Sequence, residues 1–337
     1  MAASPVATVD RPFDPDGWTG RSDLDSAGDT TRYHQRVTPW TGDAETGIGL
    51  IGFACDEGVR RNGGRPGAAE GPLAIRRALA NLAVHHATPV YDCGDIVCAG
   101  DALEAAQLRL AAAVCGIAGR PALPVVLGGG HEVAYGTWLG IADARPGAHL
   151  LIVNLDAHFD LRAGGAATSG TPFRQIADEC RLRRIPFSYV CLGISRPSNT
   201  LALFSRAAAL DVEFWRDEEL HWQALSSVDD RLQQRIAACD GVYLSIDLDV
   251  LPGEKAPGVS APAARGVSLD IVEHLAATVA KSGKLLGTDI AELNPALDRD
   301  TLTARVAARL VDAIVMAAQA SNPGSAKSGS AKLGSER

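Results

Sequence analysis

The chain has 337 residues, of which 46% are hydrophobic and 21% charged, with a formal net charge of −8. This length suits one large α/β domain or two ordinary domains. The acidic balance argues against a general binder of nucleic acid or of anionic membranes.

The first residues, the apolar stretches and the cysteines of the chain indicate its cellular location. The first ten residues lack a basic segment followed by an apolar one, so we expect no signal peptide. No apolar stretch approaches the roughly 20 residues that a membrane span needs. The seven cysteines show no C-x-x-C spacing, which favours free thiols in a reducing compartment. We therefore expect a cytoplasmic protein.

In chain order, residues 1–45 come first and are rich in Asp, Gly, Pro and Thr without sustained periodicity. They predict an N-terminal arm that packs on the body through Trp18 and Trp40. Residues 321–337 are rich in Ser, Gly, Ala and Lys and predict a disordered tail. The part between them, 46–320, is expected to be a single catalytic domain.

Within this domain, apolar strands alternate with amphipathic helices. We expect strands near 48–55, 89–92, 123–127, 150–156, 187–194, 211–214, 242–249 and 284–291. Helices are expected near 70–83, 101–118, 133–143, 224–238, 268–281 and 299–319. This alternation predicts an α/β fold with a mostly parallel sheet of about eight strands, covered by helices on both faces. Ligands bind such open sheets at the carboxyl ends of the strands.

The strand near 123–127 runs into Gly128-Gly129-Gly130-His131-Glu132. The glycines permit unusual backbone torsions and close approach, and His131 lies at the strand-to-helix junction. A lone histidine there is more often a structural hydrogen-bonding residue. A glycine-rich turn can also hold phosphate, but no Gly-Lys-[Ser/Thr] follows. Glu132 is explained by the preference of acidic residues for a first helical turn.

The strand near 150–156 ends in the segment Asn154–Arg162. Side chains two apart on a strand point the same way, so Asp156, His158 and Asp160 can converge. Carboxylate oxygens with limited imidazole suit a Mn- or Mg-like ion better than a thiolate-bound zinc.

Two later strands end in further carboxylates. Asp247 and Asp249 end the strand near 242–249, and Glu292 follows the strand near 284–291. Burying two like charges is costly unless a cation neutralises them; alternatively, the two aspartates cap a loop or pair with arginine. The strand ends together offer two imidazoles and four carboxylates, which suit two divalent ions that share bridging carboxylates and a water. This candidate metal set is His131, Asp156, His158, Asp160, Asp247 and Asp249.

Three motifs carry a resemblance to a known family: Gly-Gly-x-His at 128–131, Asp-Ala-His-x-Asp at 156–160 and Ser-x-Asp-x-Asp at 245–249. With them, residues 48–320 resemble the arginase/agmatinase (ureohydrolase) family. The resemblance implies a three-layer α/β/α fold, two Mn²⁺ ions per chain and a homo-oligomer, either a trimer or a hexamer. It implies that His131 and Asp160 bind one ion and His158 and Asp249 the other. The first aspartates of the second and third motifs would bridge the ions.

Several departures from the usual family pattern point to one branch of it. Gly130 stands where arginases and agmatinases usually have aspartate, and Ser169-Gly170 replaces a His-Gly segment whose histidine shuttles protons. Together with Trp18-x-Gly20-Arg21-x-Asp23, these features look like the formimidoylglutamase branch, which serves histidine degradation. The resemblance implies hydrolysis of N-formimidoyl-L-glutamate to L-glutamate and formamide. Glu292 would hold the amidine group.

Such a substrate carries an amidine at one end and two carboxylates at the other. Arginine offers bidentate, charge-assisted pairing to carboxylates. Arg162 lies two residues beyond Asp160 and is the first candidate, followed by Arg61 in the Gly/Arg-rich loop 56–68 and by Arg196. Each is explained equally well by a surface or intersubunit ion pair. Ser169 would lie near the substrate. Asp160 would also be catalytic, relaying the proton of the attacking water to the departing nitrogen.

Alternatives remain open at this point. The chain could be another ureohydrolase, such as an arginase, a guanidinobutyrase or an agmatinase-like enzyme. It could also be a catalytically silent, metal-binding structural or regulatory member of the family. A two-metal phosphoesterase is disfavoured, because no basic cradle beyond Arg162 lies beside the metal motifs.

Overall fold

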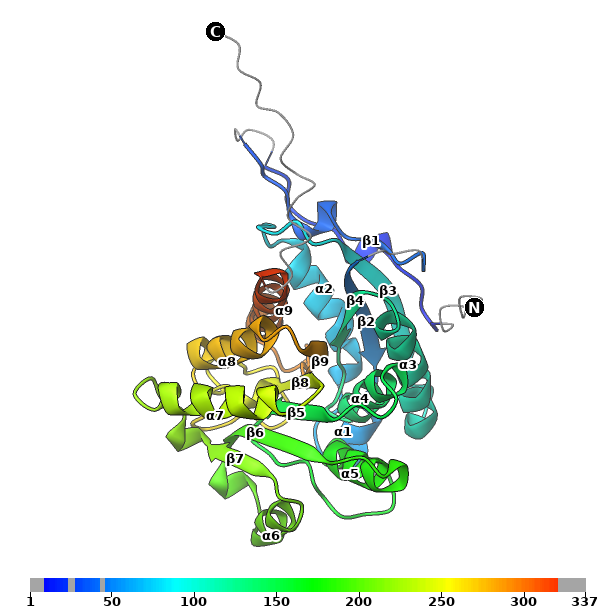
Figure 1. Cartoon of the computed structure of the whole chain (residues 1–337). Helices are drawn as coiled ribbons and strands as arrows, with labels where there is room; N and C mark the ends of the chain where they lie inside the picture. Colours follow the sequence, from blue (N-terminus) through cyan, green and yellow to red (C-terminus); the bar gives the residue numbers. More distant parts are fainter. Residues whose placement is uncertain (1–8, 24–27, 43–45, 321–337) are drawn as a thin grey trace.

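A computed structural model of the chain describes residues 9–23, 28–42 and 46–320 (Figure 1). The tail predicted for 321–337 and the start of the predicted arm lie outside these residues. In the described part of the chain, one sheet has the strand order β1-β3-β2-β4-β9-β8-β5-β6-β7, and every pairing in it is parallel. The strands are β1 (Thr38–Pro39), β2 (Gly47–Ala54), β3 (Val90–Val97), β4 (Ala122–Leu127), β5 (Leu150–Leu155), β6 (Ser188–Ile194), β7 (Glu213–Arg216), β8 (Gly241–Asp247) and β9 (Leu285–Ala291).

Helices cover both faces of this sheet, as Figure 1 shows. One layer contains α3, α4, α5 and α6, and the other contains α2, α7, α8 and α9, each packed over its own hydrophobic cluster. The helices are α1 (Glu57–Arg61), α2 (Gly71–Ala80), α3 (Leu103–Ala118), α4 (Val133–Ala144), α5 (Pro172–Arg183), α6 (Leu201–Ala209), α7 (Leu225–Ala237), α8 (Leu269–Lys281) and α9 (Leu302–Ala320). The α/β class with a mostly parallel sheet is confirmed. No helix in the described part of the chain combines the length and the apolar character that a membrane span needs.

The structure adds elements that the sequence pattern did not predict. The short strand β1 lies within the expected arm, and α1, α5 and α6 lie where no helix was predicted. The α5 helix is mostly polar, and apart from Pro172 its buried residues form one stripe of Phe173, Ile176 and Cys180. This spacing of three and four residues is helical, and Pro172 occupies the first turn, where proline is tolerated.

Strand β3 is twice as long as its predicted range, because Asp92 and Asp95 within it are neutralised. Arg76 of α2 is buried, and its Nε and Nη2 donate to the two oxygens of Asp92, each at 2.9 Å. Its Nη1 donates to Asp95 at 2.6 Å. A pattern of apolar residues cannot reveal a strand whose charges are compensated from a helix.

The N-terminal residues pack on this same part of the sheet. Trp18 is buried, and its Nε1 donates to Asp92 at 2.7 Å. Trp40 packs edge-to-face against Tyr91 of β3. Both contacts agree with the prediction that the arm uses these tryptophans. All seven cysteines lie among the described residues, and all are free thiols, as predicted.

Candidate metal centre

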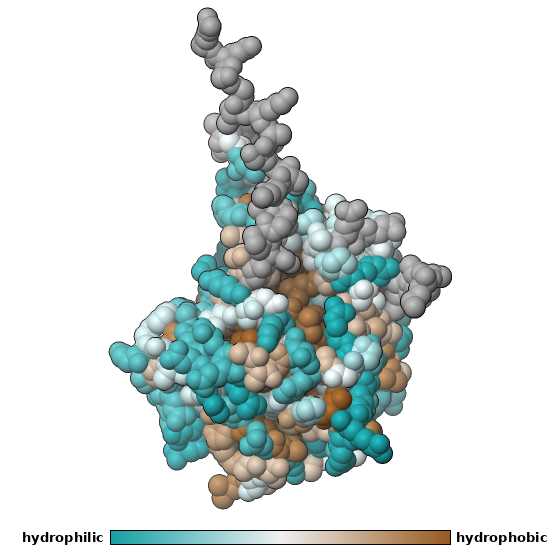
Figure 2. Space-filling view, in the orientation of Figure 1, coloured by the Kyte–Doolittle hydropathy of each residue, from teal (hydrophilic) through white to brown (hydrophobic). Residues whose placement is uncertain are grey.

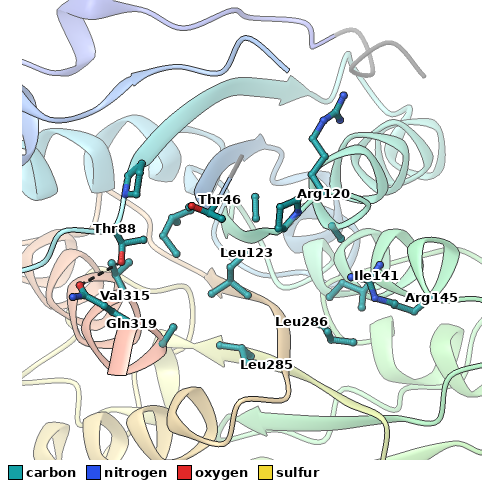
Figure 3. A pocket seen from close by; sticks show the side chains of 17 residues that line it. Thr46, Thr88, Arg120, Leu123, Ile141, Arg145, Leu285, Leu286, Val315 and Gln319 are labelled. Carbon is teal, nitrogen blue, oxygen red and sulfur yellow. Dashed lines mark hydrogen bonds between the residues drawn. The ribbon is translucent and has the colours of Figure 1, made fainter. Parts of the chain in front are cut away.

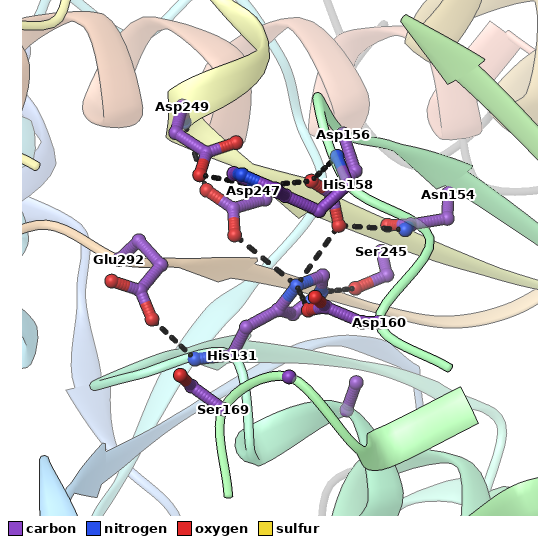
Figure 4. A network of polar contacts seen from close by, with 12 residues as sticks. His131, Asn154, Asp156, His158, Asp160, Ser169, Ser245, Asp247, Asp249 and Glu292 are labelled. Atoms are coloured by element: carbon purple, nitrogen blue, oxygen red, sulfur yellow. Dashed lines mark hydrogen bonds and ion pairs between the residues drawn. The ribbon is translucent and has the colours of Figure 1, made fainter. Parts of the chain in front are cut away.

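Four adjacent strands bring the candidate ligands together. The strands β4, β9, β8 and β5 are neighbours in the sheet, although they are far apart in the sequence. Because they are parallel, their carboxyl ends meet at one edge. His131 follows β4, the segment from Asp156 to Asp160 follows β5, Asp247 ends β8, and Glu292 follows β9. The sequence-predicted metal residues therefore lie in one polar network (Figure 4).

The first cluster gathers around His131. Its Nδ1 lies 2.8 Å from Asp160 Oδ2, 3.1 Å from Asp247 Oδ2 and 3.2 Å from Asp156 Oδ2. These four residues are buried and could hold one metal ion.

The second cluster lies beside the first and gathers around His158. Its Nδ1 lies 3.0 Å from Asp249 Oδ2 and 3.5 Å from Asp156 Oδ1. Asp156 thus offers one oxygen to each cluster, which is the arrangement of a bridging carboxylate. Asp247 falls in the first cluster only, so its predicted bridging role remains a prediction.

Backbone torsions and hydrogen bonds position these carboxylates. Asp160 and Glu292 have φ values of 47° and 71°, in the left-handed region that non-glycine residues rarely adopt. Such strain persists where the surrounding structure fixes it, and it clusters at functional sites. The Nδ2 of Asn154 donates to Asp156 Oδ2 at 3.0 Å, and the His158 amide donates to Asp156 Oδ1 at 2.6 Å. The central aspartate is therefore held from both sides.

A series of hydrogen bonds that the sequence did not predict orients His131. It runs from His131 Nε2 through Ser245 to Asp289, and we call it the relay behind His131. Asp289 of β9 is fully buried and accepts hydrogen bonds from Ser245 Oγ at 2.6 Å and from the Tyr243 hydroxyl. Ser245 Oγ lies 3.0 Å from His131 Nε2. Because Ser245 gives its proton to Asp289, it accepts a hydrogen bond from His131 Nε2, so that Nδ1, which faces the aspartates, is the nitrogen that can bind a proton or a cation. The only sequence signal was an acidic residue inside an apolar strand.

The charges of the two clusters are unbalanced. Burial raises the pKa of Asp247 well above its usual range, and the nearby Asp249 and Asp156 add to the shift. Burial and Asp156 likewise raise the pKa of Asp160. The site thus holds more carboxylate charge than its two histidines can neutralise.

A cation fits this environment. His131 Nδ1 is buried and makes no hydrogen bond of acceptable geometry among the described residues, although three carboxylate oxygens surround it. In the absence of a cation, the carboxylates raise the pKa of His131, against its burial, so that the ring takes up a proton. A divalent ion would take the place of that proton. The donor set of imidazole and carboxylate suits manganese or a similar ion.

Two glutamates lie next to the clusters. Glu292 Oε1 accepts a hydrogen bond from the His131 amide at 2.9 Å, and burial together with the charge of Glu132 raises the pKa of Glu292 to about 8. Glu132, which the sequence left as a first-turn residue, is fully buried. Its Oε1 accepts from the Gly58 amide at 2.9 Å and from Cys55 Sγ at 3.3 Å. Glu132 therefore ties Cys55, which follows β2, and Gly58 of α1 to the strand end that carries His131.

Ser169 and Arg162 lie side by side at this edge. Ser169 is buried, and its Oγ accepts from Asn62 Nδ2 at 3.2 Å. The Arg162 amide donates to the Gly170 carbonyl at 2.9 Å, and its exposed side chain runs along Gly170. A Cβ at Gly170 would lie 2.7 Å from Arg162 Cδ, so only glycine leaves room for this course of the arginine. Among the described residues, the Arg162 guanidinium forms no ion pair.

The other two candidate arginines differ in their surroundings. The guanidinium of Arg61 is occupied: it pairs with Glu57 at 2.8 Å and with Glu104 at 2.7 Å, and it donates to two backbone carbonyls. Arg196 is exposed at the start of a short 3₁₀ turn after β6 and forms no ion pair with a described residue.

Known proteins resemble the chain over nearly its whole length. The model of the arginase family matches residues 46–317. A formimidoylglutamase of Cupriavidus pinatubonensis is 54% identical over 301 residues, which cover 87% of this chain and 95% of that protein. The crystal structure of a Trypanosoma cruzi formiminoglutamase with Mn²⁺ has a TM-score of 0.75 at 27% identity and covers 86% of this chain and 98% of that one. A formimidoylglutamase structure from Bacillus subtilis has a TM-score of 0.80 at 24% identity, with coverage of 89% and 96%, and shares the fold.

Proposed function

Because the chain belongs to the arginase family, we propose that it hydrolyses N-formimidoyl-L-glutamate to L-glutamate and formamide. The observation that carries the chemistry is the set of two histidines and four aspartates at one sheet edge, all buried except the partly exposed His158, with Glu292 beside it. The names of relatives that are about half identical over most of the chain supply the substrate.

Two Mn²⁺ ions are the cofactor that we propose. His131 and Asp160 would hold one ion, His158 and Asp249 would hold the other, and Asp156 and Asp247 would be shared. When bound, the ions lower the pKa of a water molecule and supply hydroxide near neutral pH. The position of Asp156 in both clusters supports this assignment.

The residues of the chain have distinct tasks in this proposal. Glu292 would hold the amidinium nitrogens and place the formimidoyl carbon for attack. Asp160 would take the proton of the attacking water and pass it to the glutamate nitrogen, so that the bond between carbon and nitrogen breaks and glutamate leaves as the amine. Ser169 stands where relatives keep a proton-shuttling histidine and would contact substrate through its hydroxyl.

Arg162 is the arginine that we propose for the substrate carboxylates. Its guanidinium extends from the loop that carries Asp160 and is free of ion pairs with the described residues, which supports this role. Arg61 is less suited, because its guanidinium already has two carboxylate partners. Arg196 remains a second candidate.

We also propose a homo-oligomer, a trimer or a hexamer, by resemblance to the family. The free thiols of all seven cysteines support a reducing, cytoplasmic location.

One assay tests the proposed activity. Protein loaded with manganese is offered formimidoyl-glutamate, arginine and agmatine in parallel, and formamide and urea are measured. We expect formamide from the first substrate and no urea from the other two. Urea from arginine or agmatine without formamide from formimidoyl-glutamate would assign the chain to another branch. Absence of both products in metal-loaded protein would indicate a catalytically silent member.

The carboxylate site is tested by Arg162→Ala. Loss of a charge-assisted hydrogen-bonded pair costs about 1.5–3 kcal/mol, so we expect KM to rise roughly 10- to 100-fold with kcat less affected. Arg77→Ala is the matched control, because Arg77 is an exposed arginine of α2 without an ion pair among the described residues. An unchanged KM in Arg162→Ala would remove this residue from the substrate site, and Arg196→Ala would then be measured in the same way.

A further inference from the structure

A cavity of about 630 Å³ opens at the amino edge of the sheet, opposite the edge that carries the metal centre. Figure 3 shows it between the amino ends of the central strands and the carboxyl ends of α4 and α9. Hydrophobic side chains gather in a hollow between α9 and β4 in the space-filling view of Figure 2. Neither the metal centre nor the proposed reaction uses this cavity.

The cavity exists because the two central strands separate toward this edge. Strands β4 and β9 pair only through Val125–Leu127 and Thr288–Ile290, which is the half nearer the metal centre. Pro124 lies within β4 and has no amide to donate toward a neighbouring strand. The ladder between β9 and β8 shifts its register at Leu286. Toward the amino edge, β4 and β9 therefore have no backbone pairs between them.

This separation leaves apolar side chains without a covering element. Leu123 of β4 and Leu285 and Leu286 of β9 are only partly buried and line the cavity. Behind these leucines, Ile141 of α4 and Val315 of α9 also border the cavity, but both side chains are fully buried. The result is a concave aliphatic surface at the amino ends of β4 and β9, which are central in the strand order.

Polar groups stand at two sides of this surface. On one side, Thr88 Oγ1 donates to Gln319 Oε1 at 3.3 Å. On the other side lie Arg120 and Arg145, as the labels in Figure 3 show. Cationic side chains therefore stand on one side only, and they stand at the rim of the cavity, because the Arg120 side chain extends away from Leu123 in Figure 3.

Among the residues that the structure describes, no carboxylate neutralises the positive charge of these two arginines. Arg120 Nη1 donates to the Gly116 carbonyl at 2.8 Å, and Arg145 Nη1 donates to the Ala144 carbonyl at 3.0 Å. Neither forms an ion pair with any residue that the structure describes. By contrast, Arg183 of the neighbouring α5 pairs with Asp143 at 2.7 Å and with Glu179 at 2.6 Å.

We propose that this cavity is a second binding site, which takes a small organic monocarboxylate with an aliphatic or aromatic body. The body would cover the three leucines, and the carboxylate would accept hydrogen bonds from Arg120 and Arg145. The volume falls within the range of about 300–1,000 Å³ that small-molecule sites occupy. Arginine is the side chain best suited to pair with a carboxylate. The concave shape favours a small ligand over the flat face of a second copy of the chain.

The test is a calorimetric titration of the full-length, metal-loaded protein with 4-methylpentanoate. Its neutral amide and acetate serve as comparison ligands, since one lacks the charge and the other lacks the apolar body. We expect one site per chain, and binding of the amide and of acetate at least about tenfold weaker. Arg162→Ala should leave this binding unchanged, which separates the cavity from the proposed substrate site.

The decisive variant is Arg120→Ala/Arg145→Ala, with Arg77→Ala/Arg305→Ala as the matched control. All four side chains lack ion pairs with described residues, and only the first two line the cavity. Thermal unfolding establishes that both variants fold. We expect the first variant to weaken binding at least about tenfold and the control to bind like the wild type. Three results would each overturn the proposal: no binding to the wild type, equal affinity in both double variants, or affinity that falls as protein concentration rises, because a second copy then fills the cavity.

Discussion

The substitution Asp289→Asn tests whether the relay behind His131 sets the affinity of the metal centre. Asp289 is fully buried and accepts from two hydroxyls, those of Ser245 and Tyr243. Asparagine keeps the shape but has one acceptor oxygen, so one buried hydroxyl loses its partner at a cost of about 1–3 kcal/mol in the free energy of unfolding. Ser245 is then no longer committed to accept from His131 Nε2, and the imidazole loses its fixed orientation. Loss of such an outer contact weakens metal binding about 10- to 100-fold.

The assay is a calorimetric titration of chelator-stripped protein with Mn²⁺, together with thermal unfolding of the metal-free protein. Thr288→Val is the matched control. Thr288 precedes Asp289 on the same strand and is equally buried, but its hydroxyl makes no hydrogen bond with a described group. We expect the control to bind manganese like the wild type. Wild-type affinity in Asp289→Asn would refute the reasoning, and so would equal weakening in both variants.

Three further predictions concern single side chains. Asp160→Asn should lower kcat about 10²- to 10⁴-fold, as for other general acid–base groups, with the melting temperature of the metal-free protein preserved; turnover near that of the wild type would contradict its role. Arg76→Met strips Asp92 of its buried partner and should lower the free energy of unfolding by about 3–5 kcal/mol in urea titrations, whereas the exposed Arg77→Ala on the same helix should change it by less than about 0.5 kcal/mol. Burial lowers the pKa of His86 below its ordinary 6.5, so the folded state resists its protonation and stability should fall as the pH drops from about 6.5 toward the folded-state pKa. In His86→Gln this part of the pH dependence should disappear, and an unchanged slope in urea titrations across that range would show that another group causes it.

The sequence predicted the parts of the site that local pattern determines. Each ligand follows a continuous apolar run, so the end of a buried strand and the residues beyond it could be recognised from a few neighbouring positions. Asp156, His158 and Asp160 stand two apart, which gives them one common direction on a strand. The parallel arrangement then required that all such ends meet at one edge.

What the sequence could not predict depends on contacts between distant residues. The length of β3 depends on Arg76 of another element, which neutralises the two aspartates within it. The role of Asp289 depends on the adjacency of β8 and β9. The guanidinium of Arg61 is occupied partly because Glu104 of α3 forms an ion pair with it. The cavity at the amino edge arises from a ladder that is only half formed, which no run of apolar residues reveals.

The order of the strands also dictates when during synthesis the metal centre can come into being. Strands β1 to β4 form one side of the sheet and β5 to β7 the other, while β8 and β9, the last strands made, are inserted between them. Until the ribosome has passed Glu292, β4 lacks its inner neighbour, and its hydrogen-bonding edge and His131 stay open to solvent. Closure of the sheet and assembly of the two clusters are therefore one late event. Uptake of metal by a nascent or refolding chain would report that this last step is complete.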